Sequence, residues 1–339
     1  MRQEVFLMSR VVPIVFTILV AMFFASSANA RVEPDVVRHF GMCDASASEA
    51  VGSTMFIVAN DEDDVLRVYL RDQPGKPVHT FDLASFLKTG PDNREADIEG
   101  AARIGDRIYW ISSHATNKDG KPRPGRHRLF ATEVKVAGDK VTITPAGTPY
   151  QDLVKDLSET PGLKEFKLGE AAKIPPEGVG GLNIEGLAAT PQGKLLIAFR
   201  NPIPGGKALL VPLENPQEVI SGKAAKLGKP ILLFLDGRGI RSIAYFDAWG
   251  SYLIIAGPYG DSGDFKLYRW SGAASANPEP VKGLDFKDMH PEALTIYPGE
   301  KTKIQILSDD GTKQVDGKDC KDEKIKPKKK SFRSVWVTL

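Results

Sequence analysis

A short pattern that recurs about every fifty residues constrains the fold of this chain more than any other feature of its sequence. The pattern is a polar residue, an apolar residue, a second polar or charged residue, a small residue and then apolar residues. Its copies start at Asp44, Asp97, Asn183, Gly239 and His290. These starts are 53, 86, 56 and 51 residues apart. A period near fifty in strand-rich sequence predicts the four-stranded blades of a β-propeller.

The residues between these copies favour strands over helices. Each copy is followed by a short turn and a short apolar run bounded by Gly, Pro, Asp or Asn, as at 55–59 and 252–256. The chain holds 32 Gly and 24 Pro, which supply the tight turns that short strands need. We therefore predict an all-β propeller of five blades, or of six if the longest gap contains a degenerate blade. An insertion at about 150–181 lies in that gap, with a helix predicted at 150–157.

The two ends of the chain are predicted to meet in one blade. The last blade ends with its third strand at 332–339, and the N-terminal segment 32–40 is expected to supply the missing outer strand. This arrangement leaves no open sheet edge between the first and last blades. Cys43 and Cys320 are the only cysteines, 277 positions apart near these two ends. In an oxidising compartment they would form a disulfide across the junction, and the alternative is two free thiols.

The first 30 residues are predicted to be a secretory signal peptide. Arg2 and Arg10 precede an apolar run over 11–24, and residues 28–30 (Ala-Asn-Ala) have the small residues of a cleavage site. The alternative is a retained membrane anchor, although the apolar run is shorter than the ~20 residues of a spanning helix. No later segment has the hydrophobicity of a membrane span. We expect one propeller domain over 31–339, monomeric and either periplasmic or secreted.

The charge balance excludes one class of partner. Lysine and arginine together number 45, and aspartate and glutamate 43, so the formal net charge is +2. Such a chain offers no electrostatic case for binding nucleic acid. The acidic run 61–64 is interpreted as a hairpin turn in which Asp61 faces the channel mouth. The lysine-rich run 318–330 is interpreted as an exposed loop.

The repeat is predicted to place polar side chains in the central channel. The first strand of each propeller blade lines that channel, and alternate residues of a strand share one face. The first and third residues of each copy should therefore form two stacked rings. The third residues are Ser46, Glu99, Glu185, Arg241 and Glu292. His114 and Arg200, at the ends of second strands, should reach the same mouth.

Several carboxylates in one channel are costly to bury unless positive charge compensates them. Three alternatives follow: a hydrated channel with Arg–Glu pairs, a bound cation, or a ligand pocket made by the protein alone. Ca²⁺ is the cation that hard oxygen ligands suit best. The candidate metal ligands are Asp97, Glu99, Asn183, Glu185 and Glu292.

Five short segments resemble those of a known family: 43–46, 97–100, 111–114, 183–188 and 199–202. The family is exported and bacterial, and is known only as a numbered domain of unknown function (three-six-one-six). The resemblance implies a propeller and brings no established activity. A more distant similarity to phytase-like esterase and calcium-dependent lactonase propellers implies a metal at the top of the channel. Only Glu99, Asn183 and Glu185 match the ligands of that pattern.

Two functions are therefore considered for the channel mouth. In the first, the protein binds a small anionic molecule and hydrolyses an ester or phosphoester with the help of a cation. Arginines would hold the anion, and a histidine would move the proton. The candidate catalytic residues are Arg200, Arg241, His114 and His290. In the second, the propeller is a non-enzymatic binding or interaction module with a structural polar channel.

Overall fold

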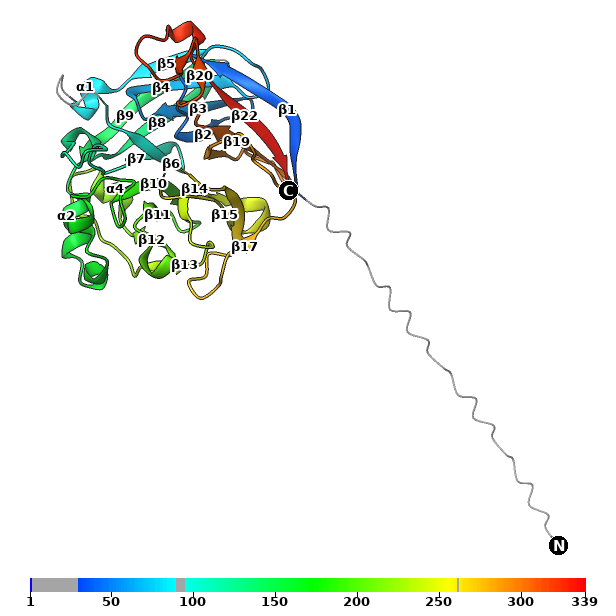
Figure 1. Cartoon of the computed structure of the whole chain (residues 1–339). Helices are drawn as coiled ribbons and strands as arrows, with labels where there is room; N and C mark the ends of the chain where they lie inside the picture. The colour runs from blue at the N-terminus through cyan, green and yellow to red at the C-terminus, as the bar shows by residue number, and fades with distance from the viewer. Residues whose placement is uncertain (2–29, 90–94, 139, 261) are drawn as a thin grey trace.

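The computed structural model describes residues 1, 30–89, 95–138, 140–260 and 262–339, so the predicted signal peptide lies almost wholly outside the described residues. Five antiparallel sheets stand side by side in a ring (Figure 1). Their inner strands β2, β6, β10, β14 and β18 contact one another in turn, and β18 contacts β2. The structure thus confirms the predicted all-β propeller and, in the part of the chain it describes, has five blades. Within the same ranges, no helix has the length and apolar character that crossing a membrane requires.

Blades 1 to 4 each contain four strands in chain order from the centre outward. Blade 1 is β2 (Ala47–Val51), β3 (Met55–Asn60), β4 (Asp63–Leu70) and β5 (His79–Asp82). Blade 2 is β6 (Ile98–Ile104), β7 (Arg107–Ser112), β8 (Leu129–Ala137) and β9 (Lys140–Tyr150). Blade 3 is β10 (Asn183–Ala189), β11 (Leu195–Asn201), β12 (Ala208–Leu213) and β13 (Ile231–Leu233). Blade 4 is β14 (Gly239–Phe246), β15 (Ser251–Gly257), β16 (Lys266–Trp270) and β17 (Glu279–Pro280).

Blade 5 joins the two ends of the chain, as predicted. Its strands, from the centre outward, are β18 (Pro291–Thr295), β19 (Lys303–Ser308), β22 (Ser331–Thr338) and β1 (Arg31–Phe40). Strand β1 pairs antiparallel with β22 from Arg31 opposite Thr338 to Phe40 opposite Ser331. The small hairpin of β20 (Gln314–Val315) and β21 (Lys318–Asp319) lies in the loop between β19 and β22.

The helices are short and lie in the connections. They are α1 (Ala84–Leu87), α2 (Leu153–Glu159), α3 (Leu168–Ala171), α4 (Pro216–Val219) and the 3₁₀ turns η1 (Pro124–Arg126), η2 (Pro161–Phe166), η3 (Pro204–Gly206), η4 (Asp247–Trp249) and η5 (Pro327–Lys329). Helix α2 begins three residues after the predicted start at Tyr150, because β9 continues to that residue. The helices of the predicted insertion bury Leu153, Leu157 and Leu168 against blades 2 and 3.

The hydrophobic core is divided among the junctions between blades. In the described residues there are five clusters of buried apolar side chains, and each lies between two neighbouring blades. The cluster between blades 5 and 1 includes Phe56, Tyr69, Tyr297 and Phe332. Since the first and last blades meet there, burial of these side chains helps to close the ring.

A histidine is buried where the ring closes. His39 of β1 stacks on Phe332, with ring centroids 5.0 Å apart, and its Nε2 lies 3.0 Å from Ser334 Oγ. Edge contacts to Phe56 and Tyr69 complete its surroundings. In the described part of the chain, His39 Nδ1 has no hydrogen-bond partner. Burial lowers the pKa of His39 from 6.5 to about 4, because the apolar surroundings disfavour the imidazolium ion.

Stability is expected to fall as the pH falls from 6.5 to about 4. In this window the unfolded chain binds a proton at residue 39 and the folded chain does not. The difference is worth about 2 kcal/mol between pH 7 and about pH 4.5. Urea unfolding at both pH values tests this, with His39→Phe as the matched variant because phenylalanine cannot be protonated. The variant should lose less stability on acidification, and an equal loss would contradict the prediction.

Candidate functional site

A β-bulge occurs at the same position in four of the five inner strands, all of which the structure describes. In β6, β10, β14 and β18 the pairing register skips one residue, and the skipped residues are Glu99, Glu185, Arg241 and Glu292. A bulged residue has no ladder partner, and the bulge redirects its side chain. Four of the five residues predicted to share the ring of third residues are therefore equivalent bulges, and the interactions below bring Glu185, Arg241 and Glu292 into contact.

The small fourth residue of the motif lets neighbouring blades approach closely. A Cβ on Gly186 would lie 2.8 Å from Ala198 Cβ and 3.0 Å from Ile243 of blade 4. A Cβ on Gly100 would similarly crowd Ile111 and Leu187 of blade 3. Glycine at these two positions thus permits the packing that sets the bulged side chains side by side.

Arg241 joins two of the predicted metal ligands. Its Nη1 lies 3.1 Å from the Glu185 carboxylate, and its Nη2 lies 2.5 Å from Glu292 Oε1. Glu185 is only 4% exposed and also accepts hydrogen bonds from Arg200 Nη1 and Asn183 Nδ2, both at 2.9 Å. Burial raises the pKa of Glu292 to about 8, although Arg241 opposes the shift. On this side of the mouth, arginines supply the charge that a cation was predicted to supply.

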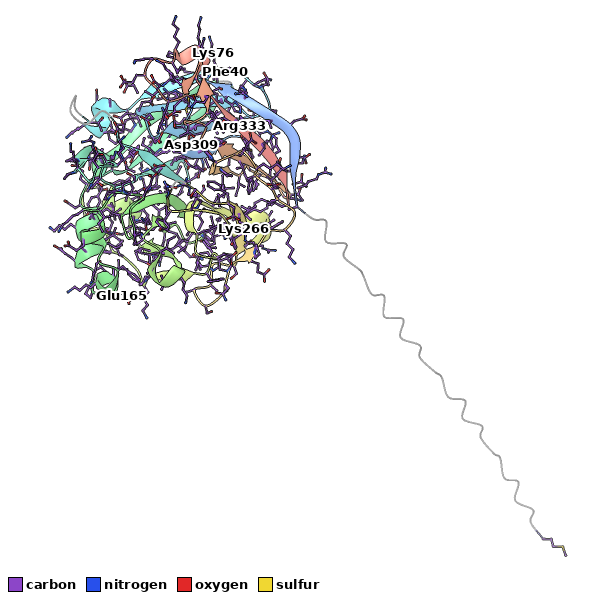
Figure 2. All side chains as sticks on the ribbon, viewed as in Figure 1. Phe40, Lys76, Glu165, Lys266, Asp309 and Arg333 are labelled. Atoms are coloured by element: carbon purple, nitrogen blue, oxygen red, sulfur yellow. A yellow bond between two sulfur atoms is a disulfide. The ribbon has the colours of Figure 1, made fainter. Side chains whose placement is uncertain are left out.

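Five carboxylates from blades 1 and 2 form the opposite side of the mouth, and we call them the acidic cluster. Their oxygens lie within 4.8 Å of one another in two triads that share Asp61. One triad is Asp44, Asp61 and Glu62, and the other is Asp61, Asp97 and Glu99. Asp44 precedes β2, Asp61 and Glu62 form the turn between β3 and β4, and Asp97 precedes β6. Asp309, at the end of β19, adds to the negative potential at Asp44 and lies inside the ring (Figure 2).

The acidic cluster is incompletely compensated. Glu62 pairs with Lys321 Nζ at 3.1 Å, and Asp97 pairs with Arg126 Nη1 at 3.0 Å. Within the described ranges, Asp44, Asp61 and Glu99 have no ion pair. Asp44 is only 2% exposed, and its Oδ1 has no hydrogen-bond partner there. This buried, unpartnered oxygen belongs to a triad in which each carboxylate has an oxygen available to a cation.

Burial and mutual repulsion disfavour the ionised forms of Asp44, Asp61 and Glu99. Burial, reinforced by Asp309, raises the pKa of Asp44 to about 9. Burial, followed by the neighbouring carboxylates, also raises the pKa values of Asp61 and Glu99 well above their ordinary range. Such a cluster is stable only with bound protons or with added positive charge.

A cavity of about 450 Å³ opens on the acidic cluster. Asp61, Glu62, Asp97 and Glu99 line its acidic wall, and Lys118, Arg123, Arg126, Arg200 and Lys321 line its basic wall. Pro175, Pro176 and Glu177 of the insertion complete it. Asn201 Nδ2 holds this part of the insertion by donating to Pro176 O at 2.8 Å and to Gly178 O at 2.7 Å. Residues of both charges therefore line a space large enough for a small molecule, and two of the acidic residues, Glu62 and Asp97, pair with basic residues of the same lining.

The two candidate histidines lie away from the cavity. His114 is fully buried beside His127, with ring centroids 5.5 Å apart, and burial lowers its pKa to about 3. Its φ of 55° departs from the strand geometry on which its placement at the mouth was predicted. His290 is exposed, and its ring packs against Phe265 at 6.0 Å. All five histidines are described, and none lines the cavity.

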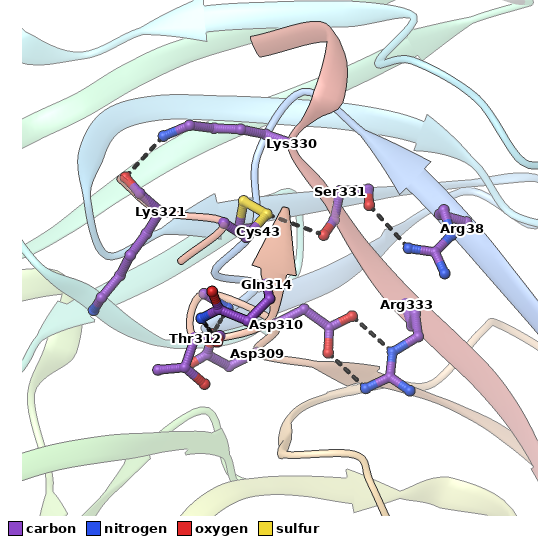
Figure 3. Close-up of a disulfide and its surroundings, with 12 residues drawn as sticks. Arg38, Cys43, Asp309, Asp310, Thr312, Gln314, Lys321, Lys330, Ser331 and Arg333 are labelled. Carbon is purple, nitrogen blue, oxygen red and sulfur yellow. Dashed lines mark hydrogen bonds and ion pairs between the residues drawn. A yellow bond between two sulfur atoms is a disulfide. The ribbon is translucent and has the colours of Figure 1, made fainter. Parts of the chain in front are cut away.

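The predicted disulfide is confirmed (Figure 3), and Cys43 directly precedes Asp44 of the acidic cluster. The Cα atoms of Cys43 and Cys320 are 6.0 Å apart. The bond ties the segment before β2 to the loop between β21 and β22. It therefore also places Lys321 near Asp44, because each of these residues follows one of the cysteines.

Sequence reasoning missed Lys321 and Arg126 as members of the site. Lys321 belongs to the run interpreted as an exposed loop, and Arg126 lies in the long connection between β7 and β8. The signal for Lys321 was present in the predicted disulfide, since a Cys43–Cys320 bond implies that the next residues are close. For Arg126 no sequence signal places its side chain.

The comparison with protein families identifies the chain. The family described as "Protein of unknown function (DUF3616)" matches residues 44–134 and 131–303, which together form most of the sequence. The chain belongs to the DUF3616 family. This confirms the family resemblance, and the family description assigns no activity. The more distant similarity to phytase-like propellers stays a prediction.

No curated protein matches the sequence. Among solved structures, glutaminyl cyclase from Myxococcus xanthus is 12% identical, with a TM-score of 0.44, covering 92% of this chain and 100% of that one. The PQQ-bound aldose sugar dehydrogenase from Streptomyces coelicolor is 14% identical, with a TM-score of 0.46, covering 92% and 98%. Virginiamycin B lyase from Staphylococcus aureus is 9% identical, with a TM-score of 0.38, covering 90% and 99%. At these values no activity is transferred to this member of the DUF3616 family.

Proposed function

We propose that the protein is an exported hydrolase that binds Ca²⁺ in the acidic cluster and cleaves a small anionic ester or phosphoester in the adjoining cavity. The observation that carries the proposal is the pair of carboxylate triads sharing Asp61, one of which contains the buried, unpartnered Oδ1 of Asp44. Export to the periplasm or beyond forms part of the proposal, because disulfides persist in oxidising compartments.

The donor set fits a hard divalent cation. Ca²⁺ takes six to eight oxygen ligands in flexible geometry, and carboxylates are its preferred side chains. Asp44, Asp61 and Glu62 would hold the cation, and Asp97 and Glu99 form the second triad around the shared Asp61. Asn183 Oδ1 is a further candidate, since it is buried without a hydrogen-bond partner in the described part of the chain and the residue lines the cavity. Two of the predicted ligands pair with arginines instead: Glu185 with Arg200 and Arg241, and Glu292 with Arg241.

The basic wall suits an anionic ligand. Arg200 is held in place by Glu185 and by the Gly260 carbonyl at 3.2 Å, so its guanidinium group is already oriented. Arg126 is held by Glu95 at 2.9 Å as well as by Asp97. Planar guanidinium groups bind phosphate or carboxylate oxygens in pairs, which favours these anions as the charged part of the ligand.

The residues of the cavity can also accept and donate the proton that is transferred during hydrolysis. Bound Ca²⁺ would polarise the ester oxygen and acidify a water molecule. Because no histidine lines the cavity, a carboxylate must accept the proton, and Glu99 is the candidate with a raised pKa and no described ion pair. The water oxygen bonds to carbon or phosphorus, the ester bond breaks, and the departing alcohol oxygen takes up the proton.

Calorimetric titration of the chelator-treated mature protein with CaCl₂, followed by a substrate panel, tests the proposal. The panel contains a phosphomonoester, an aryl ester and a lactone, each measured with Ca²⁺ and with EDTA. We expect saturable Ca²⁺ binding and turnover that EDTA abolishes. Ca²⁺ binding without turnover would replace the hydrolase by a non-enzymatic binding propeller. Failure to bind Ca²⁺ would overturn the proposal.

A further inference from the structure

We propose that Lys321 competes with the cation for the acidic cluster. Its ammonium group compensates the carboxylates when no metal is bound and is displaced when the metal binds. The inference rests on the proposed cation site and goes beyond it, because it assigns a specificity-determining role to a residue outside the set of ligands.

Lys321 contacts the triad that would hold the cation. Its Nζ lies 3.1 Å from Glu62 Oε1, and the residue lines the cavity with Asp61 and Glu62. Burial disfavours its charged form, but Asp61, Glu62 and Asp44 together hold its pKa above the ordinary value. Glu62 belongs to the triad that contains Asp44 and Asp61. A cation held by this triad would therefore lie close to a like charge.

The backbone of Lys321 cannot withdraw from the site, whereas its side chain can. The preceding residue, Cys320, is bonded to Cys43, and the Lys321 amide donates to the Gly311 carbonyl at 3.0 Å. Lys330 Nζ donates to the Lys321 carbonyl at 3.0 Å (Figure 3). The Lys321 side chain has four rotatable bonds and one described ion pair, so it can turn away when the cation enters.

The loop between β19 and β22 packs closely against Asp44, which supports a permanent contact of Lys321 with the acidic cluster. A Cβ on Gly311 would lie 1.7 Å from Asp44 Oδ1, so only glycine allows the loop to pass so close. Asp310 N donates to Cys43 O at 3.0 Å, which ties the loop to the segment that carries Asp44, and Cys320 N donates to Lys313 O at 2.8 Å within the loop. The backbone contacts of this loop therefore keep the Lys321 ammonium group near the carboxylates.

Two charges of the same sign a few ångströms apart repel strongly near a protein surface, so removing one should strengthen binding of the other. We expect Lys321→Gln to lower the Kd for Ca²⁺ about tenfold. Lys226→Gln is the matched control, because Lys226 also pairs with a glutamate, Glu218, at 3.2 Å but lies outside the cavity lining. Lys321→Arg keeps the charge and should bind Ca²⁺ as the wild type does.

The experiment is calorimetric titration of each chelator-treated protein with CaCl₂, with circular dichroism as the check that each variant is folded. Tighter binding by Lys321→Gln alone supports the inference. Equal or weaker binding by Lys321→Gln, with Ca²⁺ still bound by the wild type, overturns the inference and leaves the cation site intact. Absence of binding in the wild type and in all three variants overturns the cation site and, with it, the inference.

Discussion

Arg241→Met is expected to lower the free energy of unfolding by about 3–5 kcal/mol at neutral pH. The substitution removes the only described ion pair of Glu292 and one of two arginines on Glu185, both of which lie at the centre of the ring. Breaking a buried pair leaves an uncompensated charge, which costs more than the pair itself contributes. Urea unfolding monitored by tryptophan fluorescence measures the change.

The matched controls separate charge from packing. Arg241→Met combined with Glu292→Gln removes both charges of that pair, leaves Glu185 paired with Arg200, and should recover most of the loss. Arg269→Met removes an exposed arginine that stacks on Trp249 and should cost less than about 1 kcal/mol. If Arg241→Met were as mild as Arg269→Met, the centre of the ring would have another source of compensation.

Asp61→Asn is expected to weaken Ca²⁺ binding by about a hundredfold or more. Asp61 is the carboxylate shared by both triads, and the number of charged ligands sets the affinity of a calcium site. Without Ca²⁺ the variant should be at least as stable as the wild type, because one of several repelling carboxylates is removed. Calorimetric titration with CaCl₂ measures the first effect, and thermal unfolding in EDTA measures the second.

Asp119→Asn is the control for this pair of measurements, because Asp119 is an exposed aspartate outside the acidic cluster. Its Ca²⁺ affinity and thermal stability should match those of the wild type. A wild-type affinity in Asp61→Asn would place any calcium site elsewhere. Lower stability of Asp61→Asn in EDTA would show that the carboxylate is already compensated.

Much of the fold could be predicted from the sequence because the inner strand of each blade must meet the same packing requirement. An inner strand must be apolar enough to pack between neighbours and small enough at one position to let them approach, as Gly100 and Gly186 do. That requirement recurs every fifty residues or so and is visible without coordinates. The exchange of β1 into blade 5 was predictable for a related reason, since an incomplete last blade leaves an open edge.

The candidate site was only partly predictable, because its charges pair across blades. The motif indicates which residues face the centre. It does not indicate that Arg241 pairs with Glu185 and Glu292, because these ion pairs depend on distances in the folded protein. His114 was expected at the mouth from its place after β7, yet its backbone has left-handed rather than strand geometry and the residue does not line the cavity.

Patterns along the chain were enough to predict the propeller class, the meeting of the chain ends, the Cys43–Cys320 bond and the family. The position of the uncompensated charge could be found only in the folded molecule. Ion pairs form within a few ångströms and compete with one another, so the outcome depends on distances that the fold sets. Arg241 and Arg200 pair with Glu185, and Arg241 also pairs with Glu292, whereas Asp44, Asp61 and Glu99 have no described ion pair and two of these three, Asp61 and Glu99, line the cavity.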